Sequence, residues 1–299
     1  MIVALAGGVG GDLAVVVNTG DDFEHLGLHI SPDLDTVMYT LAGIANPVTG
    51  WGIADETWNT LDQVARLGGP DWFKLGDKDL ATHILRTQRL GRGDRLTDIT
   101  ADLCCSLGIA ARVLPMSDDA VRTMVLSGKE QYPFQDYFVR LQCGVPVTSL
   151  HFEGAANAVP SAEVIAALTD RSLSAIILCP SNPYLSVDPI LAVPGMRHLV
   201  GEAGVPVVAV SPIIGGAAVK GPAAKIMAEL GVRPSAIGIA EHYRGLIDGL
   251  MIDSVDASVA RDIETRGIRV RATSILMRDS DDRQRLAEEC IAFAKELAS

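Results

Sequence analysis

Short, largely apolar runs recur along the chain between segments with helical periodicity. Each run has three to six residues, mostly Val, Ile, Leu and Ala. Continuous apolar strands of this length that alternate with helices are typical of a mostly parallel sheet covered by helices on both faces. We therefore predict a Rossmann-like, doubly wound α/β fold. Its strands are expected over residues 2–6, 13–17, 110–114, 175–178, 205–210, 237–240, 250–252 and 268–270.

The strand pattern is interrupted between residues 51 and 107. Residues 1–50 and 108–299 are expected to form the α/β core, and residues 51–107 a helical insertion over one end of the sheet. A last helix is predicted over 282–297, because acidic residues start it and Lys295 lies in its final turn, as the helix dipole favours. The insertion shows three helical patterns, at 55–67, 77–90 and 96–107.

The charge balance narrows the range of partners. The chain has 25 Lys and Arg against 37 Asp and Glu, a formal net charge of −12. Nucleic acids and anionic membranes attract basic proteins, so neither is expected as the main partner. An anionic ligand must therefore be held by local groups.

The sequence favours a cytoplasmic protein without a membrane segment. The uncharged stretch 203–219 has 17 residues and contains two prolines and three glycines, whereas a membrane helix needs about 20 apolar residues. The apolar N-terminus lacks the basic residues of a signal peptide. The five cysteines show no disulfide or metal-ligand spacing, which indicates reduced thiols.

A glycine-rich segment, Gly7-Gly8-Val9-Gly10-Gly11, follows the first expected strand. Glycines at such a position let backbone N–H groups approach a phosphate closely. Gly8, Gly10 and Gly11 are therefore candidate phosphate-binding residues, although a tight turn would explain them as well. The segment is not a dinucleotide fingerprint, because Leu13 stands where the last glycine is required.

Acidic and small polar residues follow the second expected strand and precede the next helix. In doubly wound sheets ligands bind beyond the carboxyl ends of the strands. Carboxylates there can hold Mg²⁺ while a substrate diphosphate supplies further oxygens, although helix caps and turns use the same residues. The candidates are Asn18, Thr19, Gly20 and Asp21 after the strand, and Asp33 and Asp35 before the helix.

Two further segments are candidates for binding anionic ligands. Arg86, Arg89, Arg92 and Arg95 lie within ten residues and predict a positive lid, with solvated helix surface as the alternative. Proline turns after two later strands are expected to wall the pocket. These turns contain Ser181, Asn182 and Pro183, and the segment 211–216.

Taken together, these motifs resemble the 2-phospho-L-lactate transferase family of coenzyme F420 biosynthesis. The resemblance covers nearly the whole chain and is specific in combination. It rests on the segments GGVGG at 7–11, VNTGDD at 17–22, ISPDLDT at 30–36, WGIADETW at 51–58, KLGDKDLATH at 74–83, LPMSDD at 114–119, PSNP at 180–183 and SPIIGG at 211–216.

The resemblance implies the reaction and its participants. The acceptor would be the deazaflavin FO, and the donor a guanosine diphosphate ester of 2-phospholactate or of phosphoenolpyruvate, with Mg²⁺ required and GMP released. Asp35 and Arg86 resemble the residues that contact FO, and Asp21 with Asp35 the acidic pair near the metal. The glycine segment, Asn18 to Gly20, and Ser181 to Pro183 resemble the nucleotide-binding walls. Asp33 is a further candidate for substrate binding. The family also suggests a homodimer.

The chain departs from the family pattern at one place. The family has a helix between the glycine segment and the VNT strand, as parallel strands require, whereas Asp12 follows Gly11 directly here. A short loop cannot carry the chain back along a parallel strand, so we predict a break in the structure between Gly11 and Asp12.

Two other functions fit the sequence less well than a transferase does. A non-catalytic nucleotide-sugar-binding regulator of the gluconeogenesis-factor kind would share the glycine segment, but the 74–83 segment and the Asp33/Asp35 pair argue against it. An NAD-dependent oxidoreductase is disfavoured by the failed fingerprint at Leu13. His25 and His29 lack a further ligand at metal-binding spacing.

Overall fold

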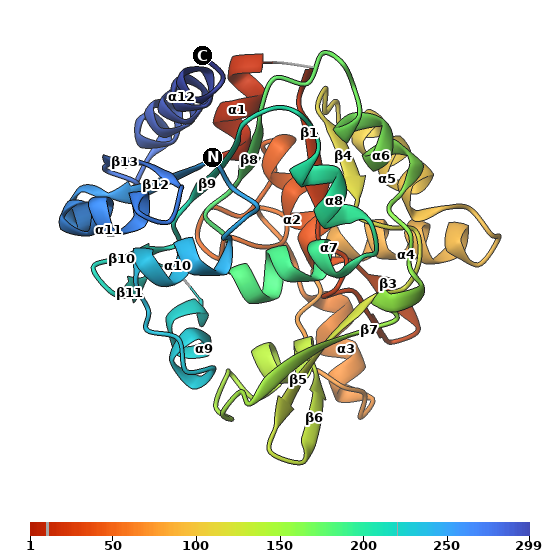
Figure 1. Cartoon of the computed structure of the whole chain (residues 1–299). Coiled ribbons are helices and arrows are strands. Elements are labelled where there is room, and N and C mark those ends of the chain that lie inside the picture. The colour runs from red at the N-terminus through yellow and green to blue at the C-terminus, as the bar shows by residue number, and fades with distance from the viewer. Residues whose placement is uncertain (10–11, 220) are drawn as a thin grey trace.

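A computed structural model describes residues 1–9, 12–219 and 221–299 of the chain (Figure 1). Its α-helices are α1 (Ile2–Val9), α2 (Pro32–Leu41), α3 (Asn59–Arg66), α4 (Asp79–Leu90), α5 (Leu96–Ser106), α6 (Ala162–Leu168), α7 (Asp188–Ala192), α8 (Met196–Gly201), α9 (Ala223–Glu229), α10 (Ala236–His242), α11 (Ala260–Glu264) and α12 (Ser280–Leu297). Its strands are β1 (Ala14–Val17), β2 (Phe23–His25), β3 (Leu28–Ile30), β4 (Arg112–Pro115), β5 (Arg122–Ser127), β6 (Glu130–Pro133), β7 (Ser149–Glu153), β8 (Ile176–Leu178), β9 (Val207–Val210), β10 (Ile213–Ile214), β11 (Ala217–Ala218), β12 (Gly249–Asp253) and β13 (Arg269–Thr273).

Parallel strands form the centre of the molecule in two parts. One part has the order β13-β12-β9-β8, and the other is the pair β1-β4. Every residue of β9 and β12 is buried, as a sheet covered on both faces requires. The Rossmann-like α/β class is confirmed.

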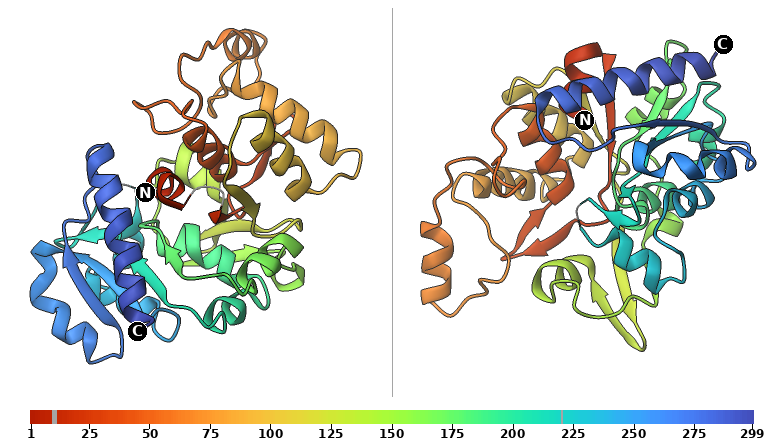
Figure 2. Two further views of the ribbon diagram at one scale, coloured as in Figure 1. Left: turned by 90° about the horizontal axis from the view of Figure 1, so that it is seen from above. Right: turned by 90° about the vertical axis from the view of Figure 1, so that its left-hand side faces the viewer.

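Helices cover both faces of the larger part of the sheet (Figure 2). On one face, Val208, Val210 and Met251 pack against Leu286 and Phe293 of α12. On the other face, alternate residues of the same strands join the main core, together with α8, α9 and α10. The smaller part packs against α2 and α5. None of the helices in the described ranges is long and apolar enough to cross a membrane.

Most of the predicted elements are present. Strands form within or beside six of the eight expected ranges, and α3, α4, α5 and α12 confirm the four expected helices. Three antiparallel units in the described part of the chain were not predicted: the sheet β6-β5-β7 and the hairpins β2-β3 and β10-β11. The α5 residues Leu96 and Cys104 share a core cluster with Val113 of β4, so the expected insertion packs directly on the sheet. Its division from the core at residues 51 and 107 stays a prediction.

Two strand predictions were wrong. Residues 2–6 belong to α1, where Ala4 and Leu5 pack against Ala287 of α12. Residues 237–240 belong to α10, whose first turn is capped by Ser235 Oγ, which accepts a hydrogen bond from Gly238 N. Short apolar runs carry no periodicity that separates a buried strand from a buried helix. Their apolar character alone therefore led to the wrong prediction.

Candidate active site

The polar segment that leaves the carboxyl end of β1 folds back onto the start of α2. The Asn18 side chain donates hydrogen bonds to Asp33 Oδ2 at 3.1 Å and to the Leu185 carbonyl at 3.2 Å, and it accepts one from Gly20 N at 2.7 Å. Asn18 therefore joins three predicted parts of the site: the strand exit, the first turn of α2 and the segment that follows β8.

Gly20 is required by close packing. A Cβ at this position would lie 2.7 Å from Thr123 Oγ1 and 2.9 Å from both Asn18 Oδ1 and Pro189 Cβ. Each separation is shorter than a side chain tolerates, so a larger residue would push these groups apart. The small residue at this turn lets β5 approach the exit of β1.

Asp21 and Asp33 are carboxylates in an environment that resists negative charge. Asp21 is buried, and Oδ1 has no hydrogen-bond partner among the described residues. Burial, and then the charge of Asp33, raises the pKa of Asp21 well above its usual value. Burial likewise raises the pKa of Asp33 to about 6. A bound cation would stabilise the ionised forms of both carboxylates.

Asp22, the last residue of the predicted acidic segment, lies beside this pair. Its Oδ2 accepts a hydrogen bond from Ser31 Oγ at 2.8 Å and lies 3.1 Å from His29 Nε2. Its Oδ1 is buried without a partner among the described residues. The acidic run 18–22 thus offers two free carboxylate oxygens, one on Asp21 and one on Asp22.

Asp35 and Arg86 form a buried ion pair between α2 and α4. Arg86 Nη1 donates to Asp35 Oδ2 at 3.1 Å, and Nη2 donates to Asp35 Oδ1. The Arg86 side chain is 0% exposed. Burial raises the pKa of Asp35, although Arg86 opposes this shift. The two residues predicted to be catalytic therefore meet, and each neutralises the other.

Asp79 and His83 complete this group. One ligand atom from each of Asp35, Asp79 and His83 lies within 4.8 Å of the others, so the three side chains could hold a metal ion. Burial raises the pKa of Asp79, but the neighbouring His83, the hydrogen bond from Tyr39 and the charge of Arg86 outweigh it and lower the pKa overall. The spacing 79, 83 and 86 on one helix face could have revealed the group from the sequence.

The predicted PSNP turn lies at the carboxyl end of β8. The Asn182 side chain accepts hydrogen bonds from Tyr184 N and Leu185 N, at 3.0 and 3.3 Å, and so caps the π-helix Pro183–Val187. Its Nδ2 is buried without a partner among the described residues. Because Leu185 also binds Asn18, the turn containing Ser181, Asn182 and Pro183 borders the acidic site.

Residues 7–9 of the glycine segment lie in α1 and not in the expected loop after a strand. Gly8 lies in α1, and a Cβ there would meet nothing within 4 Å. Gly10 and Gly11 lie outside the described residues, and so does the expected break between Gly11 and Asp12. The phosphate-binding role of the three glycines stays a prediction.

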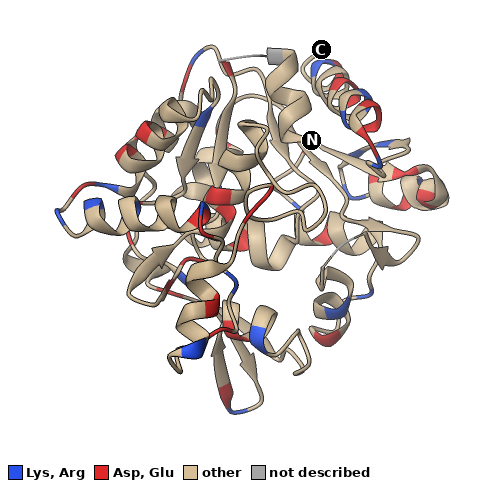
Figure 3. Cartoon of the chain, turned by 180° about the vertical axis from the view of Figure 1, so that it is seen from behind, with Lys and Arg blue, Asp and Glu red and all other residues tan. Residues whose placement is uncertain are grey.

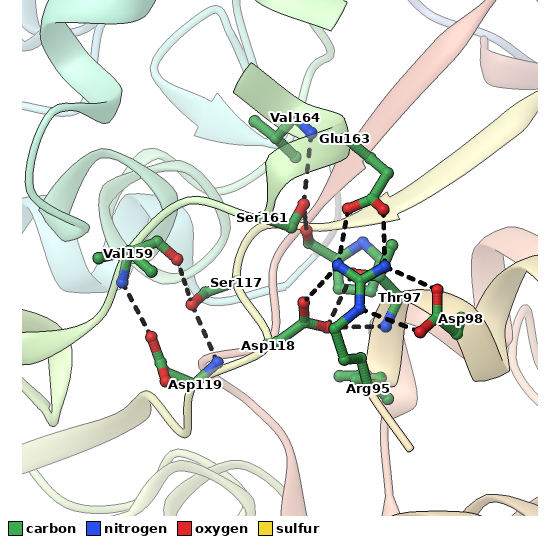
Figure 4. Close-up of polar contacts among 12 residues, drawn as sticks. Arg95, Thr97, Asp98, Ser117, Asp118, Asp119, Val159, Ser161, Glu163 and Val164 are labelled. Atoms are coloured by element: carbon green, nitrogen blue, oxygen red, sulfur yellow. Dashed lines mark hydrogen bonds and ion pairs between the residues drawn. The ribbon is translucent and has the colours of Figure 1, made fainter. Parts of the chain in front are cut away.

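Three of the four arginines of the expected positive lid are paired with carboxylates, which the sequence does not show. The lid stays a prediction. Figure 3 shows basic and acidic positions interspersed over the molecule. Arg89 pairs with Asp94 and Asp102, and Arg86 is buried. Arg95 binds three carboxylates that join α5, the segment after β4, and α6 (Figure 4). These partners are Asp98, Asp118 and Glu163.

Fold and site together define a Rossmann-like protein with a buried acidic centre at the carboxyl ends of its parallel strands. Solved structures of protein BH3568 from Bacillus halodurans, described in one case as a member of the upf0052 family, share the fold. Their TM-scores are 0.58 and 0.60 at 14% identity, over 97% of this chain and 95% and 94% of theirs.

The family follows from the sequence comparison. The model of the family 2-phospho-L-lactate transferase CofD matches residues 2–288. This chain belongs to that family of transferases. Phosphoenolpyruvate transferase of Streptomyces avermitilis is 46% identical over 316 residues, covering 99% of this chain and 98% of that protein. The protein of the same name from Mycobacterium avium is 42% identical, over 90% of this chain and 81% of its own length.

Proposed function

We propose that this protein transfers the phosphoenolpyruvyl group from its guanosine diphosphate ester to the deazaflavin FO in coenzyme F420 biosynthesis, and releases GMP. The family match over residues 2–288 is the observation that carries this proposal. The names of the relatives from Streptomyces avermitilis and Streptomyces griseus, 46% and 44% identical, favour phosphoenolpyruvate over 2-phospholactate as the transferred acid.

The reaction exchanges one bond to phosphorus for another. The terminal hydroxyl of FO attacks the phosphorus that bears the three-carbon acid, and a new P–O bond forms. The P–O bond to GMP breaks, and the hydroxyl proton leaves. Phosphoryl transfer of this kind depends mainly on positioning and on stabilising charge at the phosphate oxygens.

Asp35 is proposed to orient the hydroxyl of FO and to accept its proton. A carboxylate at the N-terminal turn of α2 is suited to this role when its position is fixed. Arg86 holds both oxygens of Asp35, so we assign Arg86 the role of fixing the carboxylate and keeping it charged. In the transition state the guanidinium would also favour the negative charge that develops nearby.

The walls around the acidic centre are proposed to bind the guanosine diphosphate part of the donor. The Asn182 amide offers a buried donor without a partner among the described residues, as a phosphate or nucleotide contact requires. Asn18, Thr19, Gly20 and Asp33 form the facing wall. Thr19 Oγ1 is another buried polar atom for which the described residues provide no partner. Ser181 and Pro183 shape the turn beside Asn182.

Mg²⁺ is the cation that we propose for this centre. The free oxygens of Asp21 and Asp22 and the adjacent carboxylate of Asp33 are the hard ligands that Mg²⁺ prefers. Asp35, proposed with Asp21 from the resemblance, has both oxygens on Arg86, so Asp21 is the better-suited first ligand. When bound, the ion would neutralise charge on the diphosphate of the donor.

Three further proposals concern the covering segment, the assembly and the small-molecule partners. The segment 51–107 is proposed to cover the site from α4, which carries Arg86. A cytoplasmic homodimer is the proposed form, and light scattering after gel filtration measures the assembly. FO and the guanosine donor are the proposed small-molecule partners.

The test is to incubate the protein with FO, Mg²⁺ and each guanosine donor, and to identify the deazaflavin product by mass spectrometry. The proposal expects GMP and the phosphoenolpyruvyl adduct of FO, with the 2-phospholactyl donor used more slowly. Donor binding without GMP release would contradict the proposal and would favour the regulatory alternative.

A further inference from the structure

The contact between α2 and α4 is built from polar side chains at helical spacing. Asp35 and Tyr39 lie four residues apart on α2, and Asp79, His83 and Arg86 follow the spacing of four and three on α4. Such spacings place each set on one helix face. All five residues are buried, and Tyr39, His83 and Arg86 are at most 1% exposed.

His83 lies at the centre of this contact. Its Nδ1 is 3.4 Å from Arg86 Nη1 and 3.6 Å from Asp35 Oδ2. Its Nε2 is 3.3 Å from Asp79 Oδ1, although the two are not aligned as a hydrogen bond. The imidazole thus touches both members of the Asp35–Arg86 pair on one side and Asp79 on the other.

Asp79 is itself held from α2. Tyr39 Oη donates a hydrogen bond to Asp79 Oδ1 at 2.6 Å and lies 2.8 Å from Thr82 Oγ1, whose hydroxyl can donate back to it. A chain of contacts therefore runs from Tyr39 through Asp79 and His83 to Arg86 and Asp35. Its first and last members both lie on α2, so the chain closes on itself.

We propose that His83, supported by Asp79 and Tyr39, is a positioning residue that sets the orientation of the Asp35–Arg86 pair toward the acceptor hydroxyl. This inference rests on the proposed function. The imidazole Nδ1 lies against Arg86 Nη1 and beside Asp35 Oδ2. It therefore restricts the guanidinium to the orientation in which Arg86 makes both of its contacts with Asp35. Apolar residues at a buried contact often stabilise a fold as well as charged ones, so stability does not explain this polar set.

Two nearly isosteric substitutions separate positioning from packing. In His83→Asn an amide atom can lie where Nδ1 lies, whereas His83→Leu has a similar shape without polar atoms. His198→Leu, at an exposed position of α8, is the control for loss of a histidine. For each variant we would measure kcat, KM for FO, the Mg²⁺ concentration for half-maximal rate, and thermal stability.

The expected result is a kcat at least ~10-fold lower for His83→Leu, with KM for FO and the Mg²⁺ requirement nearly unchanged, because a misplaced catalytic group lowers the rate of the chemical step. The Asn variant recovers most of the loss, and His198→Leu matches the wild type. A Leu variant as active as the wild type, or no more impaired than the Asn variant, would overturn the proposal. A raised Mg²⁺ requirement would make His83 a metal ligand instead.

A second measurement does not depend on activity. The side-chain N–H signals of Arg86 in an NMR spectrum report whether its guanidinium is held. Slow exchange of these protons is expected in the wild type and in His83→Asn, and faster exchange in His83→Leu and, to a smaller degree, in Tyr39→Phe. Equal exchange in all four proteins would refute the positioning role, whereas an inactive wild type with this exchange pattern would refute only the proposed reaction.

Discussion

At the residue scale, the site is defined by carboxyl groups whose ionisation is made unfavourable by burial. Asp21, Asp33 and Asp35 all have raised pKa values, and burial is the first cause in each case. The responses differ, because Arg86 neutralises Asp35 whereas Asp21 and Asp33 repel each other. Clusters of shifted carboxylates are typical of functional sites. Asp35 differs from the other two because an arginine holds it, whereas Asp21 and Asp33 are available to a cation.

Asp33→Asn is expected to change how stability depends on pH. The folded protein binds the Asp33 proton more tightly than the unfolded chain, since burial raises the pKa from 3.8 to about 6. The metal-free wild type should therefore lose stability as pH rises through this range, by at most ~3 kcal/mol. The variant should unfold at a higher temperature than the wild type at pH 8 and at a similar one near pH 4.

Mg²⁺ supplies the matched control for this prediction. Mg²⁺ should raise the melting temperature of the wild type at pH 8 by more than that of Asp33→Asn, because only the wild type has the Asp33 carboxylate beside Asp21 and Asp22. An equal shift in both proteins would show that the ion does not bind beside Asp33.

Asp35→Asn is expected to lower kcat on the order of 100-fold, because an amide does not accept the proton of the hydroxyl. It also leaves the buried Arg86 without its counter-ion, which costs up to about 3–5 kcal/mol. Turnover must therefore be measured well below the melting temperature. Asp102→Asn, whose side chain is 68% exposed, is the control, and an Asp35→Asn enzyme with normal turnover would contradict the assignment.

Much of the site was predictable from residue type and strand position. Asn18, Gly20, Asp33 and the 181–183 turn meet as expected, because the carboxyl ends of parallel strands share one edge. The partners of the arginines were not predictable, since Asp35 and Glu163 are distant in sequence from Arg86 and Arg95. A cluster of like charges in a sequence does not reveal such neighbours.

At the element scale, helix ends explain both correct and wrong predictions. The acidic first turn of α12 was recognised, and Asp279 caps that helix by accepting a hydrogen bond from Asp282 N. The cap at Ser235 was overlooked, so α10 was predicted as a strand. α1 has no acidic residue in its first turn and no basic residue in its last, so the sequence gives no helix-end signal that separates it from a strand.

Asp118→Ala and Arg95→Ala test which contacts secure α5. Asp118 Oδ1 accepts hydrogen bonds from Thr97 N and Thr97 Oγ1, both at 2.8 Å, at the start of the helix (Figure 4). Loss of this cap should cost about 1–2 kcal/mol. The Arg95 side chain is 42% exposed, so its substitution should cost less than ~1 kcal/mol despite three ion pairs. Chemical denaturation measures both, and a larger loss for Arg95→Ala would contradict this ranking.

At the scale of the whole molecule, the parallel sheet is divided between β1 and β8. Among the described residues, β1 pairs with β4 alone and β8 with β9 alone. Ala4 and Leu5 of α1 lie in one cluster with Leu13 and Ile177, next to these two strands. The alignment with the Streptomyces avermitilis protein spans 316 residues, more than the 299 of this chain. The relatives therefore carry residues without a counterpart here.

An insertion tests whether this difference divides the sheet. A helix-forming segment of the relative, placed between Gly11 and Asp12, would supply the crossover that parallel strands need, about a dozen residues or more. Residues 2–6 are then expected to pair as a strand between β1 and β8. Hydrogen exchange of the amides of β1 and β8 should slow, and unchanged exchange would show that the divided sheet is the preferred arrangement.

The central claim is that this chain is an FO-dependent transferase, and the most direct measurement is the stoichiometry of GMP release. With the guanosine diphosphate ester of phosphoenolpyruvate and Mg²⁺ in excess, the account predicts one GMP for each FO added and none without FO. GMP release that is independent of FO, or its absence at saturating FO, donor and Mg²⁺, would contradict the account.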